Sequence, residues 1–183
     1  MSFSEADNKL NLNYKHLGIY LVAGIASGLL CELIYTNHDV WKYVGPSLVL
    51  GVMITLAGRY ISGIAPRNTW LSPWMLILAC GIGWFLAFEF GVAYTAKDWS
   101  WIGSGIIGGF FVGIGLVIVW TLKRIWMVIV LTTLAGGLGG LVFALSDFFG
   151  FDEFFPLFVT WQGILLVGSG IAIQIDSRKS SIL

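Results

Sequence analysis

The sequence has little charge and few of the side chains on which most enzyme sites depend. Charged residues make up 11% of the 183 residues, against about 25% in a soluble domain. The only histidines are His16 and His38, which fall on opposite sides of the predicted membrane, and neither has a partner at metal-ligand spacing. The only cysteines, Cys31 and Cys80, lie inside apolar spans at different depths. We therefore expect no haem, metal site or disulfide, and interpret the cysteines as small packing residues.

Motifs that mark catalytic or nucleotide-binding sites are also missing. The chain has no nucleophile elbow, HExxH, P-loop or dinucleotide fingerprint. The glycine-rich segment "GSGIIGG" (103–109) lies inside an apolar span and lacks the preceding strand that a nucleotide loop requires. We predict that the protein is not an enzyme, carries no cofactor and binds no nucleic acid.

Long apolar runs dominate what is present. Hydrophobic residues make up 57% of the chain, and the mean hydropathy is +0.87. A membrane-spanning helix needs roughly 20 mostly apolar residues. Six segments meet this requirement, at about 17–36, 43–64, 72–95, 101–122, 125–146 and 155–175. The sequence thus predicts an all-α integral membrane protein with six transmembrane helices in one membrane domain (17–176), a polar N-terminal tail (1–16) and a short C-terminal tail (177–183).

The N-terminal tail does not resemble a secretory signal. It is polar and carries Glu5 and Asp7, whereas a signal peptide begins with a basic segment and leads into a shorter apolar one. We expect the first span to be retained as a helix.

The basic residues predict the orientation. Only Lys42 and Lys97 lie on one side of the six-span arrangement. The other eight basic residues lie on the opposite side: Lys9, Lys15, Arg59, Arg67, Lys123, Arg124, Arg178 and Lys179. Because the side richer in Lys and Arg is normally cytoplasmic, we expect a multi-pass protein of the cell (inner or plasma) membrane with both termini in the cytoplasm.

Similar segments recur along the chain. A shift of 57 residues aligns "GIASGLLCE" (24–32) with "GIGWFLAFE" (81–89) and pairs Glu32 with Glu89. The glycines that carry the repeat are Gly24 with Gly81, Gly51 with Gly108, and Gly58 with Gly115; "GLGGLVFAL" (137–145) and the pair Gly163 and Gly170 extend it to a third copy. This period predicts three tandem two-helix hairpins (about 17–66, 72–122 and 125–176) around a pseudo-threefold axis.

Glycines at four-residue spacing form stripes on three of the predicted helices. They are Gly24 and Gly28, then Gly105, Gly109 and Gly113, and finally Gly136 and Gly140. Small residues let helices approach closely in lipid, where burial of apolar surface no longer drives association. The stripes therefore favour tight packing within the chain; the alternative is a seam between copies of the protein, on the helix 101–122.

Acidic residues fall near the outer ends of three spans. Glu32 shares a helix face with Gly24 and Gly28, so we expect it to face neighbouring helices. Glu89 and Asp147 hold related positions, and Gln162 lies at a similar depth. These four residues are candidates for binding a proton or a small cation. Alternatively, the acids are structural and accept hydrogen bonds from a Trp N–H, a hydroxyl group, or the lysine of their own hairpin (Lys42 or Lys97).

Two functions fit these features. The first is a tightly packed, non-enzymatic subunit or scaffold of a membrane assembly, in contact with the lipid bilayer and with other membrane proteins or copies of itself. The second is a small proton- or cation-linked transporter or channel that uses the outer carboxylates. The first is favoured because few polar residues continue from the carboxylates toward the middle of the membrane.

Overall fold

The computed structural model describes residues 12–37, 44–61, 70–94, 99–148 and 155–178, and it is helical there except for short flanking segments and the connection 120–124. The six helices are α1 (Tyr14–Asn37), α2 (Gly45–Ile61), α3 (Ser72–Ala93), α4 (Ser100–Val119), α5 (Ile125–Phe148) and α6 (Phe155–Arg178). The all-α prediction is therefore confirmed for the described residues.

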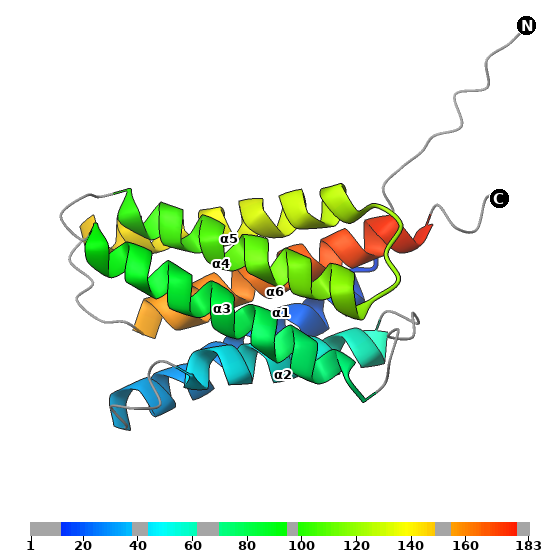
Figure 1. Cartoon of the computed structure of the whole chain (residues 1–183), viewed down its shortest axis with the longest axis horizontal. Helices are drawn as coiled ribbons and strands as arrows, with labels where there is room; N and C mark the ends of the chain where they lie inside the picture. The colour runs from blue at the N-terminus through cyan, green and yellow to red at the C-terminus, as the bar shows by residue number, and fades with distance from the viewer. Residues whose placement is uncertain (1–11, 38–43, 62–69, 95–98, 149–154, 179–183) are drawn as a thin grey trace, which may run out of the picture.

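The helices form a closed ring. Each helix packs against the next one along the chain, and α6 packs against α1. Successive helices run in opposite directions, so the start of α1 and the end of α6 lie at the same end of the bundle (Figure 1). We call this the basic end, because it carries Lys15, Arg59, Lys123 and Arg124. The contacts of α4 with α3 and α5 are the most extensive, and those of α2 with its two neighbours are the least.

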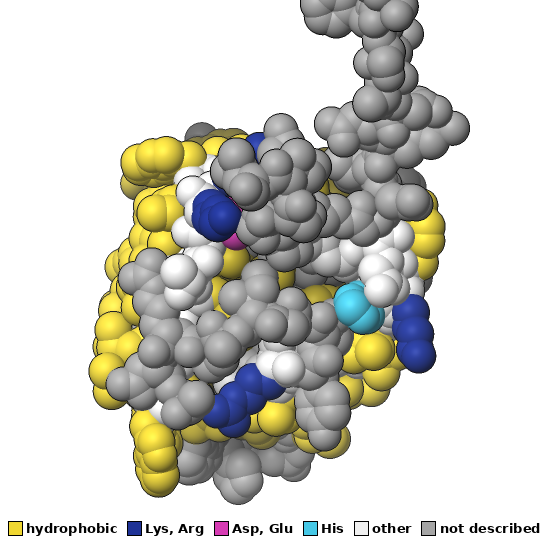
Figure 2. Space-filling view, turned by 90° about the vertical axis from the view of Figure 1, so that its right-hand side faces the viewer, with side chains coloured by type: hydrophobic (Ala, Val, Ile, Leu, Met, Phe, Trp, Pro, Cys, Tyr) yellow, Lys and Arg dark blue, Asp and Glu magenta, His cyan; other side chains and the backbone are white. Residues whose placement is uncertain are grey.

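Among the described residues, five helices are long and apolar enough to cross a bilayer. The exception is α2, which has 17 residues and at 1.5 Å per residue is about 26 Å long, slightly less than a typical hydrocarbon core of about 30 Å. Large hydrophobic side chains such as Val22, Leu78 and Leu134 are exposed around the ring. Viewed from the basic end, yellow hydrophobic surface borders the molecule and blue Lys and Arg side chains lie on the end itself (Figure 2). These features are those of an integral membrane protein.

The fourth span is shorter than predicted. We expected a helix over 101–122, but α4 ends at Val119 and Trp120 has an extended backbone (φ −104°, ψ 149°). The Trp120 side chain is completely buried and packs on Gly58 of α2. The extended backbone of Trp120 ends α4 and directs the chain toward α5, while the indole ring of Trp120 remains in the core.

The interior of the ring is filled by apolar side chains. The largest buried ones include Tyr20, Ile54, Leu76, Trp120 and Leu165, and they form one cluster with contributions from all six helices. Glycines make room for the rings: Tyr20 packs on Gly170 in the same way that Trp120 packs on Gly58.

The predicted threefold repeat remains a prediction. In each predicted repeat, two glycines seven residues apart lie on the second helix. The second of these glycines packs against a large side chain, but the helix relation differs from one repeat to the next. Gly58 of α2 receives Trp120, the residue that follows α4; Gly115 of α4 receives Leu76 from α3, and Gly170 of α6 receives Tyr20 from α1.

Candidate functional site

Glu32 lies on the face of α1 that meets α6. The glycines one and two turns before it touch the α6 backbone: a Cβ atom on Gly24 would lie 2.7 Å from the Cα atom of Gly163, and one on Gly28 would lie 2.7 Å from the carbonyl oxygen of Phe158. Glu32 itself is partly buried. The glycine stripe thus brings α1 against α6 and places the carboxyl group at the end of their contact.

A buried polar contact lies beside Glu32. Gln162 of α6 donates a hydrogen bond from Nε2 to Cys31 Sγ (3.2 Å), and the Cys31 thiol faces the carbonyl oxygen of Pro46 on α2 (3.6 Å). Both side chains are completely buried, and Gln162 Oε1 has no hydrogen-bond partner among the described residues. Cys31 therefore links three helices, a role that sequence analysis missed because its partners are distant in the sequence.

Glu89 is placed differently from Glu32. It is exposed, and on the same outward face of α3 lie Leu78, Ile82, Phe85 and Val92, all exposed as well. The buried face of α3 is the opposite one, which includes Ala79, Gly83 and Ala87. We call the exposed set the α3 outward face. Because α2 separates α1 from α3 in the ring, the structure does not bring Glu32 and Glu89 together.

The other two candidate site residues also differ in position. Asp147 lies in the last turn of α5, but its side chain falls outside the described residues. Gln162 is buried between α6 and α1. In the part of the chain that the structure describes, no three His, Cys, Asp or Glu side chains lie close enough together to hold a metal ion.

The longest glycine stripe is used inside the chain. Gly105 and Gly109 of α4 contact Gly136 of α5, and a Cβ atom on Gly109 would lie 3.1 Å from its Cα atom. Gly113 of α4 contacts Thr132, which is also on α5, and Gly140 of α5 contacts the backbone of Trp101 on α4. This face of α4 is therefore covered by α5, and it cannot also form a seam between copies without separating the two helices.

The basic end holds two polar contacts that sequence analysis missed. The buried Asp176 of α6 accepts hydrogen bonds from the backbone N–H groups of Lys123 (3.0 Å) and Arg124 (2.6 Å), immediately before α5 begins. Gln174, two residues earlier on α6, accepts one from the backbone N–H of Asn13 (2.8 Å), immediately before α1 begins. One helix thereby holds the start of both its neighbours, and Asp176 also carries the charge that a helix N-terminus favours.

Aromatic side chains fill the opposite half of the ring. Trp161 is buried and lies against Gly108 of α4 and Gly139 of α5, and its ring centroid is 6.4 Å from that of Trp84. Phe158 is completely buried, with its centroid 5.5 Å from that of Trp84. Indole rings therefore occupy the space where a central pore would have to pass.

The buried hydroxyl groups do not provide a polar path either. Thr55, Thr132 and Ser169 donate to carbonyl oxygens one turn earlier on their own helices, at 2.8–2.9 Å. These bonds satisfy the hydroxyls locally. Among the described residues, the charged side chains lie toward the two ends of the bundle.

No family model matches the chain, and no match was found among curated proteins or solved structures.

Proposed function

We propose that the protein is a non-enzymatic subunit or scaffold of a membrane assembly, with six spans and its basic end in the cytoplasm. The observation that carries this proposal is Glu89 on the α3 outward face. Its position in a span-length apolar helix is unfavourable in contact with lipid alone.

The free-energy cost of exposing Glu89 to lipid depends on its depth in the membrane. It lies four residues before the end of α3 at Ala93, which is about 6 Å along the helix axis. A charged residue at the centre of a span costs about 2.5–3.5 kcal/mol, and less near its end. A donor from a second protein would offset that cost, whereas lipid tails offer none.

The shape of the α3 outward face suits one partner helix. Leu78, Ile82, Phe85, Glu89 and Val92 are spaced by four, three, four and three residues, as in helices that pair at about 20°. The partner is then a transmembrane helix with Lys, Arg, or a hydroxyl or amide donor at the depth of Glu89. The glycine stripes are unavailable for this role, since α4, α5 and α6 cover them.

The test is native mass spectrometry of the protein released gently from its own membrane. We expect a stoichiometric complex with another membrane protein for the wild type, and loss of that complex in Glu89→Gln and in Phe85→Ala. The matched control is Phe110→Ala, because Phe110 is exposed on α4 and lies away from the proposed interface. An intact complex in both α3 variants would contradict docking on α3; a wild-type protein without any partner would contradict the subunit function itself.

A proton- or cation-linked transporter is the second candidate. It is favoured by the position of Glu32 beside the buried Gln162–Cys31 contact. In that case Glu32→Gln, Glu89→Gln and Asp147→Asn proteoliposomes should lose ion flux while the protein stays folded. Wild-type flux in all three variants would exclude the carboxylates as the coupling site.

A further inference from the structure

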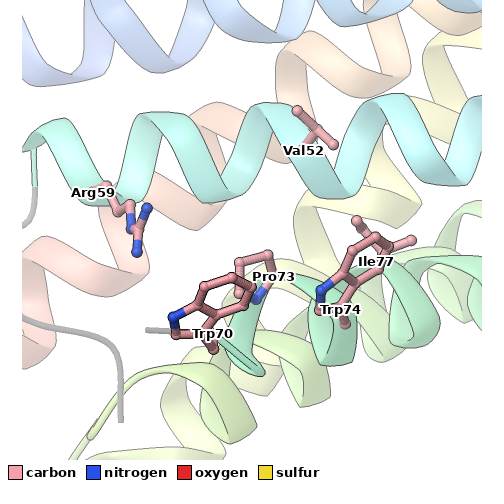
Figure 3. A pocket seen from close by; sticks show the side chains of 6 residues that line it. All are labelled: Val52, Arg59, Trp70, Pro73, Trp74 and Ile77. Atoms are coloured by element: carbon pink, nitrogen blue, oxygen red, sulfur yellow. The ribbon is translucent and has the colours of Figure 1, made fainter. Parts of the chain in front are cut away.

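A groove opens between α2 and α3 at the basic end. Its volume is about 510 Å³. The lining residues are Val52 and Arg59 of α2 and Trp70, Pro73, Trp74 and Ile77 at the start of α3 (Figure 3). We call it the Arg59 groove.

A close helix contact bounds the groove on its deeper side. A Cβ atom on Gly51 of α2 would lie 2.9 Å from the Cα atom of Ile77 on α3, so the two backbones nearly touch there. Arg59 lies about two helical turns from Gly51 toward the basic end. Trp70 lies seven residues before Ile77, just before α3 begins, and so is displaced toward the same end. The groove therefore begins at the apolar contact and ends where the bilayer surface is expected.

The side chains change in character along the groove. Val52 and Ile77 are apolar, and they lie at its deep end. Arg59 is exposed, and its guanidinium group points across the groove toward Trp70 (Figure 3). Trp70 and Trp74 are 85% and 65% exposed, which is unusually open for indole rings in a water-soluble protein but typical of rings at a membrane surface.

We propose that the Arg59 groove binds one phospholipid of net negative charge. Its phosphate lies on the Arg59 guanidinium, and an acyl chain follows Val52 and Ile77 toward the middle of the bilayer. Arginine donates to phosphate in a bidentate manner, and its charge favours a lipid whose headgroup is anionic. The tryptophans flank the glycerol region, where amphipathic rings are stable.

A lipid explains the groove better than a free phosphate ion does. Five of its six lining residues are apolar or aromatic, and an inorganic ion would contact none of them favourably. Val52 and Arg59 are seven residues apart on α2, about 10 Å along the axis. This separation gives the phosphate and the first acyl carbons distinct places. The inference is independent of whether a partner protein docks on α3.

The experiment measures lipid binding to the full-length protein in detergent by native mass spectrometry. The probes are phosphatidylglycerol, phosphatidylcholine and inorganic phosphate. We expect one phosphatidylglycerol per protein, weaker binding of phosphatidylcholine, and no displacement by inorganic phosphate. Arg59→Gln should weaken phosphatidylglycerol binding about ten- to hundredfold, as expected for loss of a charge-assisted hydrogen bond, and Arg59→Lys should weaken it less.

Two controls distinguish specific binding in the Arg59 groove from non-specific attraction of an anionic lipid to the basic end. Lys123→Gln removes another exposed cation from the basic end and should leave phosphatidylglycerol binding unchanged. Circular dichroism of each variant checks that the helices remain. Equal phosphatidylglycerol binding by Arg59→Gln and wild type would overturn the proposal. Equal affinity for phosphatidylcholine, or displacement by inorganic phosphate, would also overturn it.

Discussion

At the scale of single residues, two neighbouring polar side chains on α6 organise the basic end. Gln174 and Asp176 accept hydrogen bonds from the chain just before α1 and α5 begin. The first N–H groups of a helix have no partner within the helix. The acceptors matter here because Asp176 is buried, and a backbone N–H group that is shielded from water needs an acceptor within the protein. The two side chains therefore supply acceptors that a short turn could not supply itself.

Asp176→Ala should destabilise the bundle. The substitution leaves the backbone N–H groups of Lys123 and Arg124 without an acceptor at a site where Asp176 is 3% exposed. We expect the free energy of unfolding to fall by about 1–3 kcal/mol. Asp176→Asn should cost less, because an amide oxygen still accepts. The measurement is thermal unfolding in mild detergent, followed by circular dichroism. Equal midpoints for Asp176→Ala and wild type would show that the contact contributes nothing.

Residue roles were predictable only where a residue stands out within its own helix. Glu32 was expected to face neighbouring helices because it shares a helix face with Gly24 and Gly28, and it is partly buried. Gln162 was predicted only to lie at a similar depth, and it is completely buried. Asp176 was missed because its partners are backbone N–H groups in a turn 52 residues away. Such partners leave no mark in the amino-acid sequence.

At the scale of helices, the glycine stripes decide which faces touch. Sequence spacing predicted that Gly24 and Gly28 share one face and that Gly105 and Gly109 share another. Which helix covers each face was not predictable, since any neighbour with a flat surface could do so. The structure pairs the first stripe with α6 and the second with α5. The end of α4 was also misplaced, because hydropathy alone does not distinguish the helical Val119 from the extended, equally buried Trp120.

Gly109→Ala tests the contact between α4 and α5. The added methyl group would meet the carbonyl oxygen of Thr132 and the backbone of Gly136, and backbone atoms cannot move aside as a side chain can. We expect a loss of about 1–3 kcal/mol in the free energy of unfolding. The matched control is Gly81→Ala on α3, where the nearest atom is Ser47 Oγ at 3.6 Å. It should be neutral or slightly stabilising. The comparison uses unfolding midpoints in one detergent, and similar losses for both variants would contradict the assigned contact.

At the scale of the whole molecule, the ring of helices is closed, and buried side chains of the described residues fill its interior. The sequence predicted helix number and direction, but closure depends on the contact of α1 with α6 between the two ends of the chain, and no local pattern encodes it. The packing of side chains inside the ring was not predictable from the sequence either. No sequence pattern predicted the neighbours of Trp161, yet it lies against glycines of α4 and α5 and near Trp84 of α3. A filled centre favours a packed subunit over a central pore.

Trp161→Ala tests whether this filling holds the ring together. Trp161 is 6% exposed, whereas Trp126 on α5 is 77% exposed. Removing a buried indole deletes contacts with three helices and leaves a cavity, so we expect a loss of about 3–5 kcal/mol in the free energy of unfolding. Trp126→Ala removes the same side chain from an exposed position and should cost much less. Thermal unfolding in the same detergent compares the two variants directly. If both lose the same stability, Trp161 is not a central packing residue, and the case against a pore through the ring loses its main structural support.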